Sequence, residues 1–289
     1  FDISDLLLVF IRELISNSSD ALEKRRHFEL VAGNEGVIDN EVPMQITITA
    51  DADANTLTIQ DTGIGMSREE LIENLGTIAR SGSKNFLEQL KDGDGPTGPS
   101  ASNVIGQFGV GFYSVFMVAD HVTVYSRPHG EDKAYCWTSG GDGSYELSEA
   151  SNVSAGTKIV LKLKDAEKEY STSWRVESNI KKYSNFVGFP VLVNGERLNT
   201  VEALWTKAKS EVTDEQHNEF YRFVAQSFDD PRYKLHFTAD APVAINAIFY
   251  IGQTHVEKWG MARQEPGVHL YSRKVLIESR CDKLLPEGR

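Results

Sequence analysis

The sequence predicts an α+β fold, a two-layer α/β sandwich in which helices cover one face of a mixed or antiparallel sheet. Apolar residues recur with helical spacing over residues 6–26, and polar and apolar residues alternate in a hairpin formed by residues 45–48 and 56–59. The other strand-like segments follow one another without regularly alternating helices, at residues 122–126, 135–138, 145–147 and 157–163. This clustering favours antiparallel neighbours over a parallel sheet built from crossover helices.

Further elements complete this first unit. Residues 91–102 are rich in Gly, Pro, Asp and Ser and predict a loop, and Asn194-Gly195 predicts the turn of a second hairpin over residues 191–198. Helical spacing continues in four more segments, at residues 69–75, 84–90, 112–118 and 174–186.

A second, shorter unit follows a boundary expected near residues 199–210, so that the chain divides into residues 1–200 and residues 201–289. Thr213 and Gln216 have the spacing of a capping box, which predicts a helix that continues to residue 227. Strands are expected at residues 233–238, 243–251 and 270–277.

Composition excludes several classes of protein. Hydrophobic residues make up 40% and charged residues 25% of the 289 residues, which is typical of a folded globular chain. The formal net charge of -12 disfavours sequence-independent binding to nucleic acid. Cys136 and Cys281 lie far apart without a metal-ligand spacing, and the longest uncharged stretch, residues 103–119, is too short and too polar to insert into a membrane.

The first predicted helix carries a polar stripe. Positions i, i+4, i+7 and i+11 fall on one face of a helix, and here they hold Glu13, Asn17, Asp20 and Lys24. A solvated helix face is the simpler interpretation of such a stripe. The amide among the charges favours a functional one, because a carboxylate can polarise a water while an amide oxygen one turn away binds Mg²⁺.

Two glycine-rich motifs adjoin predicted elements: the first follows a predicted strand, and the second precedes a predicted helix. In the run DTGIGM, Asp61 follows a strand, and Gly65 and Met66 offer a flexible backbone and an apolar wall to a planar base. For a lone Asp-Thr-Gly, an ordinary Asx turn is the better explanation. The run GQFGVGF, residues 106–112, supplies free amides for phosphate oxygens, although it matches neither GxGxxG nor a Walker A loop.

The polar stripe, the DTGIGM run and the GQFGVGF run, in this order along the chain, resemble the gyrase, heat-shock chaperone, histidine kinase and mismatch-repair (GHKL, or Bergerat) ATPases. Four segments resemble the ninety-kilodalton heat-shock chaperones nearly residue for residue: IRELISNSSDAL at 11–22, DTGIGM at 61–66, NLGTIA at 74–79 and GQFGVGF at 106–112. Three more are most similar to the mitochondrial branch of that family: SGSK at 81–84, YSNF at 183–186 and YSRKVLI at 271–277. The resemblance spans the chain and departs at residues 5–9.

The resemblance implies a role for each matching residue. Glu13 would activate the attacking water, Asn17 would hold Mg²⁺, and Asp61 with Thr157 would read the adenine of ATP or ADP. Asp20 and Lys24 would support the pocket. Base and sugar would contact Gly65, Met66, Asn74, Leu75 and Phe112. The phosphates would be wrapped by Gly106, Gln107, Phe108, Gly109, Val110 and Gly111 under a lid at about residues 76–105. Arg80 occupies a basic lid position in the family, although a solvated lid charge is the favoured interpretation.

The implied function is that of a Mg-dependent ATPase that drives the folding of client proteins. The same resemblance implies a homodimer in the full-length protein and a location in the mitochondrial matrix. Residues 1–200 would be the ATPase domain and residues 201–289 the start of a middle domain. The family's catalytic arginine is expected to lie beyond these residues, so we expect tight binding with feeble turnover. Two alternatives remain at this point, a GHKL ATPase that acts on DNA and a nucleotide-binding module that does not hydrolyse ATP.

Overall fold

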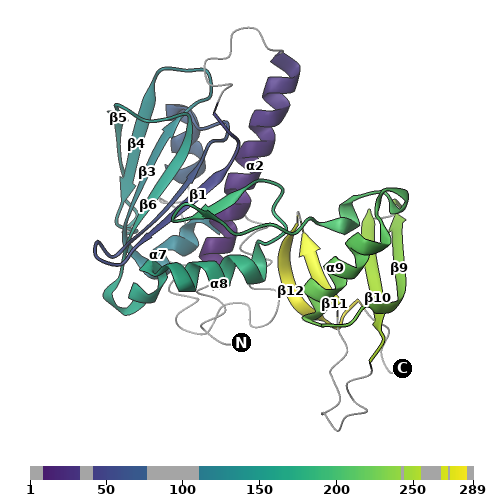
Figure 1. The fold of residues 1–289 in the computed structure, drawn as a ribbon. Helices are drawn as coiled ribbons and strands as arrows, with labels where there is room; N and C mark the ends of the chain where they lie inside the picture. Colours follow the sequence, from purple (N-terminus) through teal and green to yellow (C-terminus); the bar gives the residue numbers. More distant parts are fainter. Residues whose placement is uncertain are drawn as a thin grey trace. The chain divides into compact units, whose positions relative to one another are not determined.

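The computed structural model describes residues 9–32, 42–76, 111–241, 244–254, 268–272 and 274–284 (Figure 1). The chain forms two compact units. The first comprises Phe1–Thr200 and Tyr271–Ile277, and the second comprises Val201–Leu270 and Glu278–Arg289. Residues 271–277, which the sequence assigns to the second unit, thus cluster with the first.

The first unit contains an eight-stranded sheet with the order β5-β4-β3-β6-β2-β1-β7-β8. The β1–β7 pair is parallel and the other neighbouring pairs are antiparallel, so that of the two expected arrangements, mixed or antiparallel, the sheet is mixed. The strands are β1 (Ile46–Asp51), β2 (Thr56–Asp61), β3 (Ala119–Arg127), β4 (Ala134–Ser139), β5 (Glu146–Ala150), β6 (Gly156–Leu163), β7 (Val191–Val193) and β8 (Glu196–Arg197).

Helices cover one face of this sheet and leave the other open (Figure 1). The long helix α2 (Val9–Ala32) contacts β1, β2 and α8 (Ser173–Tyr183). Its buried side chains include Ile11, Ile15 and Leu22, the apolar face predicted opposite the polar stripe. The shorter helical segments are α3 (Arg68–Leu71), η1 (Ile72–Gly76), η2 (Gly111–Ser114), α7 (Val115–Val118) and η3 (Asp165–Ser171).

Helix α2 is longer than the sequence predicts. The apolar periodicity ends near residue 26, yet the helix continues to Ala32. Arg25, with 1% of its surface exposed, donates from Nη1 to the carbonyl oxygen of Thr62 at 2.7 Å and from Nη2 to that of Val42 at 2.9 Å. The predicted end was wrong because contacts that the apolar pattern does not display extend past it: Glu29 Oε1 accepts from Arg25 Nε at 2.7 Å and lies 3.3 Å from His129 Nε2.

The second unit begins with two short 3₁₀ segments, η4 (Leu204–Thr206) and η5 (Lys209–Glu211), followed by α9 (Asp214–Ala225). The predicted capping box is confirmed, since Thr213 Oγ1 accepts from the Gln216 N–H and Gln216 Oε1 accepts from the Thr213 N–H. The hairpin of β9 (Pro231–Ala239) and β10 (Ile245–Gly252) contributes Tyr250, whose ring contacts those of Phe220 and Tyr221 on α9.

The segment predicted as one strand at residues 270–277 is instead a pair of strands, β11 (Val268–Ser272) and β12 (Val275–Cys281). Lys274 lies between them with a left-handed φ of 66°. The single-strand prediction was wrong because this turn contains neither Gly nor Asn, the residues that normally mark such a conformation. Tyr271 packs edge-on against Phe186 at 5.4 Å between ring centroids, which anchors this segment in the first unit.

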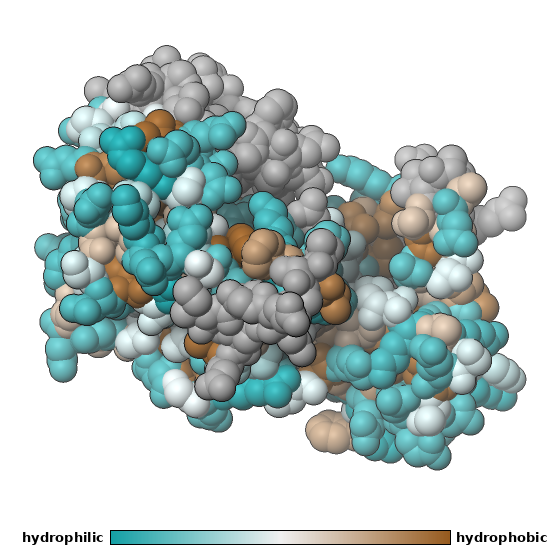
Figure 2. Space-filling model, turned by 90° about the horizontal axis from the view of Figure 1, so that it is seen from above, coloured by the Kyte–Doolittle hydropathy of each residue, from teal (hydrophilic) through white to brown (hydrophobic). Residues whose placement is uncertain are grey.

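The surface seen in Figure 2 is mostly hydrophilic, with hydrophobic residues exposed in scattered patches. Within the described ranges, no helix has both the length and the apolar character needed to cross a bilayer.

Candidate functional site

Asp61 ends β2 beneath α2 and is almost completely buried, with 4% of its surface exposed. Its Oδ1 accepts the backbone N–H of Gly63 at 2.9 Å and that of Thr157, from β6, at 3.3 Å. The Ser18 hydroxyl, from α2, also hydrogen-bonds the carboxylate. A helix, a strand end and a neighbouring strand therefore converge on one carboxylate.

Burial raises the pKa of Asp61 from 3.8 to about 6, because removal from water penalises the charged form. The hydrogen bonds from Gly63, Thr157 and Ser18 favour the ionised carboxylate and act in the opposite direction. At neutral pH Asp61 is thus a buried anion that can accept a hydrogen bond from a ligand.

The turn after Asp61 lies too close to its neighbours for larger residues. A β-carbon at Gly65, where φ is 70°, would lie 2.1 Å from the carbonyl oxygen of Arg127. At Gly63 a β-carbon would lie 2.7 Å from the backbone of Ala21 on α2. The two glycines are therefore required by close approach of the turn to α2 and to the end of β3.

A chain of hydrogen bonds connects the turn to β6. The Met66 N–H donates to Ser126 Oγ at 2.9 Å, and this hydroxyl lies 3.0 Å from Thr157 Oγ1. Thr157 and Ser126 are both buried, at 8% and 0% exposed. Thr157 therefore contacts Asp61 through its backbone, and its side chain is connected to the 61–66 turn through Ser126.

Glu13 lies on α2 beside the first residue of η2. A β-carbon at Gly111 would lie 2.6 Å from Glu13 Oε2, so only glycine fits there without moving the carboxylate. The other oxygen, Oε1, forms an ion pair with Arg12 Nη2 at 3.2 Å. Asn17, one turn further along α2, is exposed.

The remaining predicted contacts of the base lie on η1 and η2. The Asn74 amide nitrogen lies 3.9 Å from Met66 Sδ. Leu75 is buried, and its carbonyl oxygen accepts a hydrogen bond from the Tyr113 hydroxyl. Phe112 is buried against Trp137 with 6.0 Å between ring centroids.

The predicted site residues thus form two clusters along α2. One groups Asp61 and Thr157 with the 61–66 turn, and the other pairs Glu13 with Gly111. Asp20 is half-buried on the same helix, whereas Lys24 is exposed. Arg80, the run Gly106, Gln107, Phe108, Gly109 and Val110, and all of the expected lid except Gly76 lie outside the described residues.

Sequence reasoning missed two serines. Ser18 was read only as part of the helix motif, although it is buried and hydrogen-bonds Asp61. Ser126 occupies an inward position of β3, where Val122 and Val124 are also buried. The available signal was a polar residue at a position that the inward and outward alternation of strand side chains assigns to the core.

A dedicated metal cage is absent from the described ranges, which contain no cluster of three or more His, Cys, Asp or Glu side chains able to hold a metal. The polar stripe of α2 offers oxygen atoms from Glu13, Asn17 and Asp20. Mg²⁺ is usually bound through one or two protein ligands together with substrate phosphates and water, and this donor set fits that mode.

Two family models match the chain. One, described as histidine kinase-, DNA gyrase B-, and HSP90-like ATPase, matches residues 7–173, and the other, described as Hsp90 protein, matches residues 192–288.

Similar curated proteins include the mitochondrial TNF receptor-associated protein 1 homolog of Dictyostelium discoideum, 50% identical over 96% of this chain and 38% of that protein. The mitochondrial heat shock protein 75 kDa of Bos taurus is 51% identical over the same shares. The chaperone protein HtpG of Desulfitobacterium hafniense is 48% identical over 96% of this chain and 45% of its own length. The chain spans less than half the length of these relatives. By both family matches, it belongs to the histidine kinase-, DNA gyrase B-, and HSP90-like ATPases and, within them, to the Hsp90 proteins.

Proposed function

We propose that the first unit binds ATP and ADP, with Asp61 accepting a hydrogen bond from the exocyclic amine of adenine. The observation that carries this proposal is the buried Asp61 carboxylate, whose fixed donors come from three separate elements. A turn with a purely structural role does not need a buried anion, because removal of a charge from water is energetically unfavourable. The family also supports it, since the matching model describes ATPases.

Glu13 is the proposed general base of ATP hydrolysis. It lies on the same helix as Ser18, whose hydroxyl bonds Asp61, so base recognition and water activation would be fixed by one rigid element. Gly111 adjoins its carboxylate, and the amides of residues 106–111 are the proposed donors to the phosphates. Asn17, one turn from Glu13, is the proposed protein ligand of nucleotide-bound Mg²⁺, which would neutralise phosphate charge when bound.

In the whole protein we propose that this ATPase drives an ATP-dependent chaperone that acts on client proteins as a homodimer. The relative from Bos taurus is named a heat shock protein, and the relative from Desulfitobacterium hafniense is named a chaperone protein. The Hsp90 match over residues 192–288 favours this function over an ATPase that acts on DNA, and the net charge of -12 agrees. Two of these relatives are named mitochondrial, and we propose the mitochondrial matrix as the location.

Calorimetric titration with ADP, with and without Mg²⁺, tests the proposal. We expect saturable binding of one nucleotide, strengthened by Mg²⁺, and loss of the Mg²⁺ effect in Asn17→Ala with metal-free binding preserved. Ser16→Ala, on a neighbouring position of α2, is the control and should retain both. An absence of ADP binding by the folded chain would refute the proposal.

A further inference from the structure

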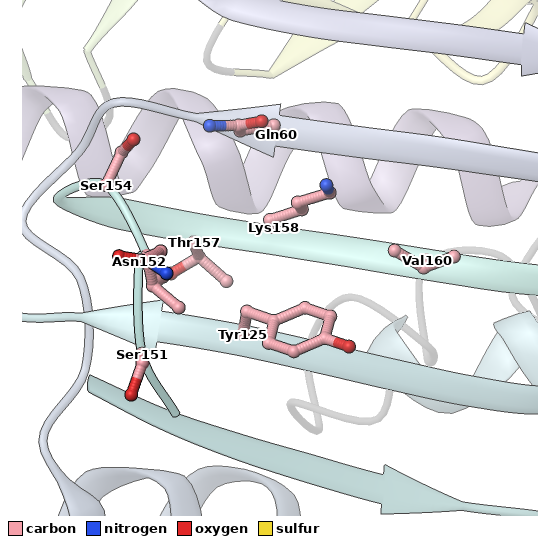
Figure 3. Close-up of a pocket in the computed structure, with 9 residues that line it drawn as sticks. Gln60, Tyr125, Ser151, Asn152, Ser154, Thr157, Lys158 and Val160 are labelled. Atoms are coloured by element: carbon pink, nitrogen blue, oxygen red, sulfur yellow. The ribbon is translucent and has the colours of Figure 1, made fainter. Parts of the chain in front are cut away.

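A cavity of about 370 Å³ opens on the sheet face that the helices leave uncovered (Figure 3). Strands β2, β6 and β3 form its floor, and the loop of residues 151–154, between β5 and β6, forms one wall. This volume is near the lower end of the range of small-molecule sites, roughly 300–1,000 Å³.

Three residues in adjacent strands form the floor. Gln60 pairs with Lys158, and Lys158 pairs with Tyr125. Directly paired residues of neighbouring strands project to the same face, and Figure 3 shows these three side chains side by side on the open one. Val160, two residues along β6, adds an apolar surface beside the Tyr125 ring.

The wall of the cavity is fixed by hydrogen bonds. Arg127 donates from Nε to the carbonyl oxygen of Val153 at 2.8 Å and from Nη1 to that of Glu131 at 2.6 Å. Asn152 adopts a left-handed conformation with a φ of 59°. An arginine thus braces the loop against the turn after β3, so the cavity is formed without a ligand.

The lining is cationic and has spare hydrogen-bonding capacity. Lys158 supplies a positive charge, and none of the lining residues is acidic. Among the residues that the structure describes, the side chains of Lys158 and Gln60 have no hydrogen-bond or ion-pair partner. An ammonium and an amide that line the same cavity as an aromatic ring are suited to a flat ligand with one negative group.

We propose that this cavity binds a small aromatic carboxylate, with the carboxylate on Lys158 and Gln60 and the ring against Tyr125 and Val160. The site does not depend on the proposed nucleotide pocket, because Asp61 and the buried side chains of β6 face the helices. Thr157 nevertheless links the two sides, since it lines the cavity and donates its N–H to Asp61. Because the two sites lie on opposite faces of the sheet, we expect that both can hold their ligands at the same time.

Titration of the isotope-labelled chain with benzoate, followed by NMR, tests the site. We expect saturable shifts of the amides of Gln60, Tyr125, Val153 and Lys158, and at least about tenfold weaker binding of benzamide, which has the same shape without the charge. Lys158→Gln should weaken benzoate binding by a similar factor. Lys162→Gln removes the same charge from the same face of β6 outside the cavity and should bind benzoate as the wild type does.

Equal binding of benzoate by Lys158→Gln, equal binding of benzamide, or no shift at these residues would overturn the proposal. Tyr125→Leu, which shortens the ring wall without changing charge, guards against misfolding of the lysine variant and should also weaken binding. Repeating the titration at saturating ADP separates the two sites. Displacement of benzoate by ADP would place it in the nucleotide pocket and refute the new site, whereas failure of ADP to bind would refute only the proposed function.

Discussion

Oε2 of Glu13 lies 2.6 Å from the position that a β-carbon would occupy at Gly111. The carboxylate of α2 and the start of η2 are therefore in direct contact, although 98 residues separate them in sequence. Gly111 has no side chain and therefore leaves room for the carboxylate of Glu13, the proposed general base. The first two predictions test this contact.

Glu13→Ala should retain ADP affinity and lose ATP turnover, because the proposed base is removed while the contacts to adenine remain. General-base catalysis contributes roughly a hundredfold or more, so hydrolysis should fall by at least that factor. Steady-state phosphate release and calorimetry on the same preparation measure the two effects. Glu23→Ala, at a partly exposed position of the same helix, is the control. Unchanged turnover in Glu13→Ala would exclude Glu13 as the general base, whereas a wild-type chain without any turnover would leave a module that only binds nucleotide.

Gly111→Ala should displace the Glu13 side chain and reduce ATP turnover by at least about tenfold, with a smaller effect on nucleotide affinity. The added methyl group cannot be accommodated without movement at a distance of 2.6 Å. Gly140→Ala is a matched control, because its β-carbon would make only an ordinary contact, 3.7 Å from the carbonyl oxygen of Asp120. Wild-type turnover in Gly111→Ala would show that the position of the Glu13 side chain does not affect catalysis.

Asp61→Asn should abolish ADP binding while the chain stays folded. The substitution replaces the charged acceptor by an amide of nearly the same shape, and it also removes a charge whose burial is unfavourable. Calorimetry should show no binding, and the thermal midpoint should stay the same or rise. Asp53→Asn in the exposed turn between β1 and β2 is expected to bind ADP normally.

Nucleotide affinity should weaken as the pH falls through about 6. The pKa of Asp61 is raised from 3.8 to about 6, so the folded chain takes up a proton there that the unfolded chain takes up only at lower pH. Below about 6 this proton stabilises the fold but occupies the acceptor of the adenine amine, and affinity should drop about tenfold per pH unit. ADP titrations between neutral pH and about pH 5 measure this slope, and an affinity independent of pH would contradict it.

The second unit should lose stability as the pH falls below about 6.5. Burial lowers the pKa of His217 and His236, and Lys234 and Lys209 respectively act in the same direction. Since the unfolded state then binds more protons than the folded state, the free energy of unfolding decreases with acidification. Hydrogen exchange of β9 and β10 amides measures it.

His236→Gln should flatten this pH dependence, because it removes one of the two buried imidazoles. His121→Gln, at an exposed position of β3, is the control and should leave the exchange of β9 and β10 as in the wild type. Identical pH profiles for His236→Gln and wild type would assign the effect to other groups.

Local patterns predicted the elements whose signals are complete within a few residues. The capping box of Thr213 and Gln216 opens α9, and Asn194-Gly195 turns the β7–β8 hairpin with φ values of 47° and 91°. The motif order along the chain likewise pointed to the family that the comparisons confirm. These signals depend on neighbours in sequence, which the sequence displays directly.

Three features of the structure could not be read in this way. The apolar pattern ended α2 early, because Glu29, beyond the predicted end, meets His129, which lies 100 positions further along the chain. Ser126 looked like an ordinary strand residue, although its hydroxyl connects Met66 and Thr157. The return of residues 271–277 to the first unit depends on Tyr271 meeting Phe186.

The sequence by itself thus determined the mixed α+β sandwich, the family and the identity of the candidate side chains. Only the tertiary structure decided that Asp61 is a buried anion with a raised pKa, and that Glu13 meets Gly111. The physical reason is that desolvation and close contact arise from all the atoms around a group. Those atoms come from strands and helices that lie far apart along the chain.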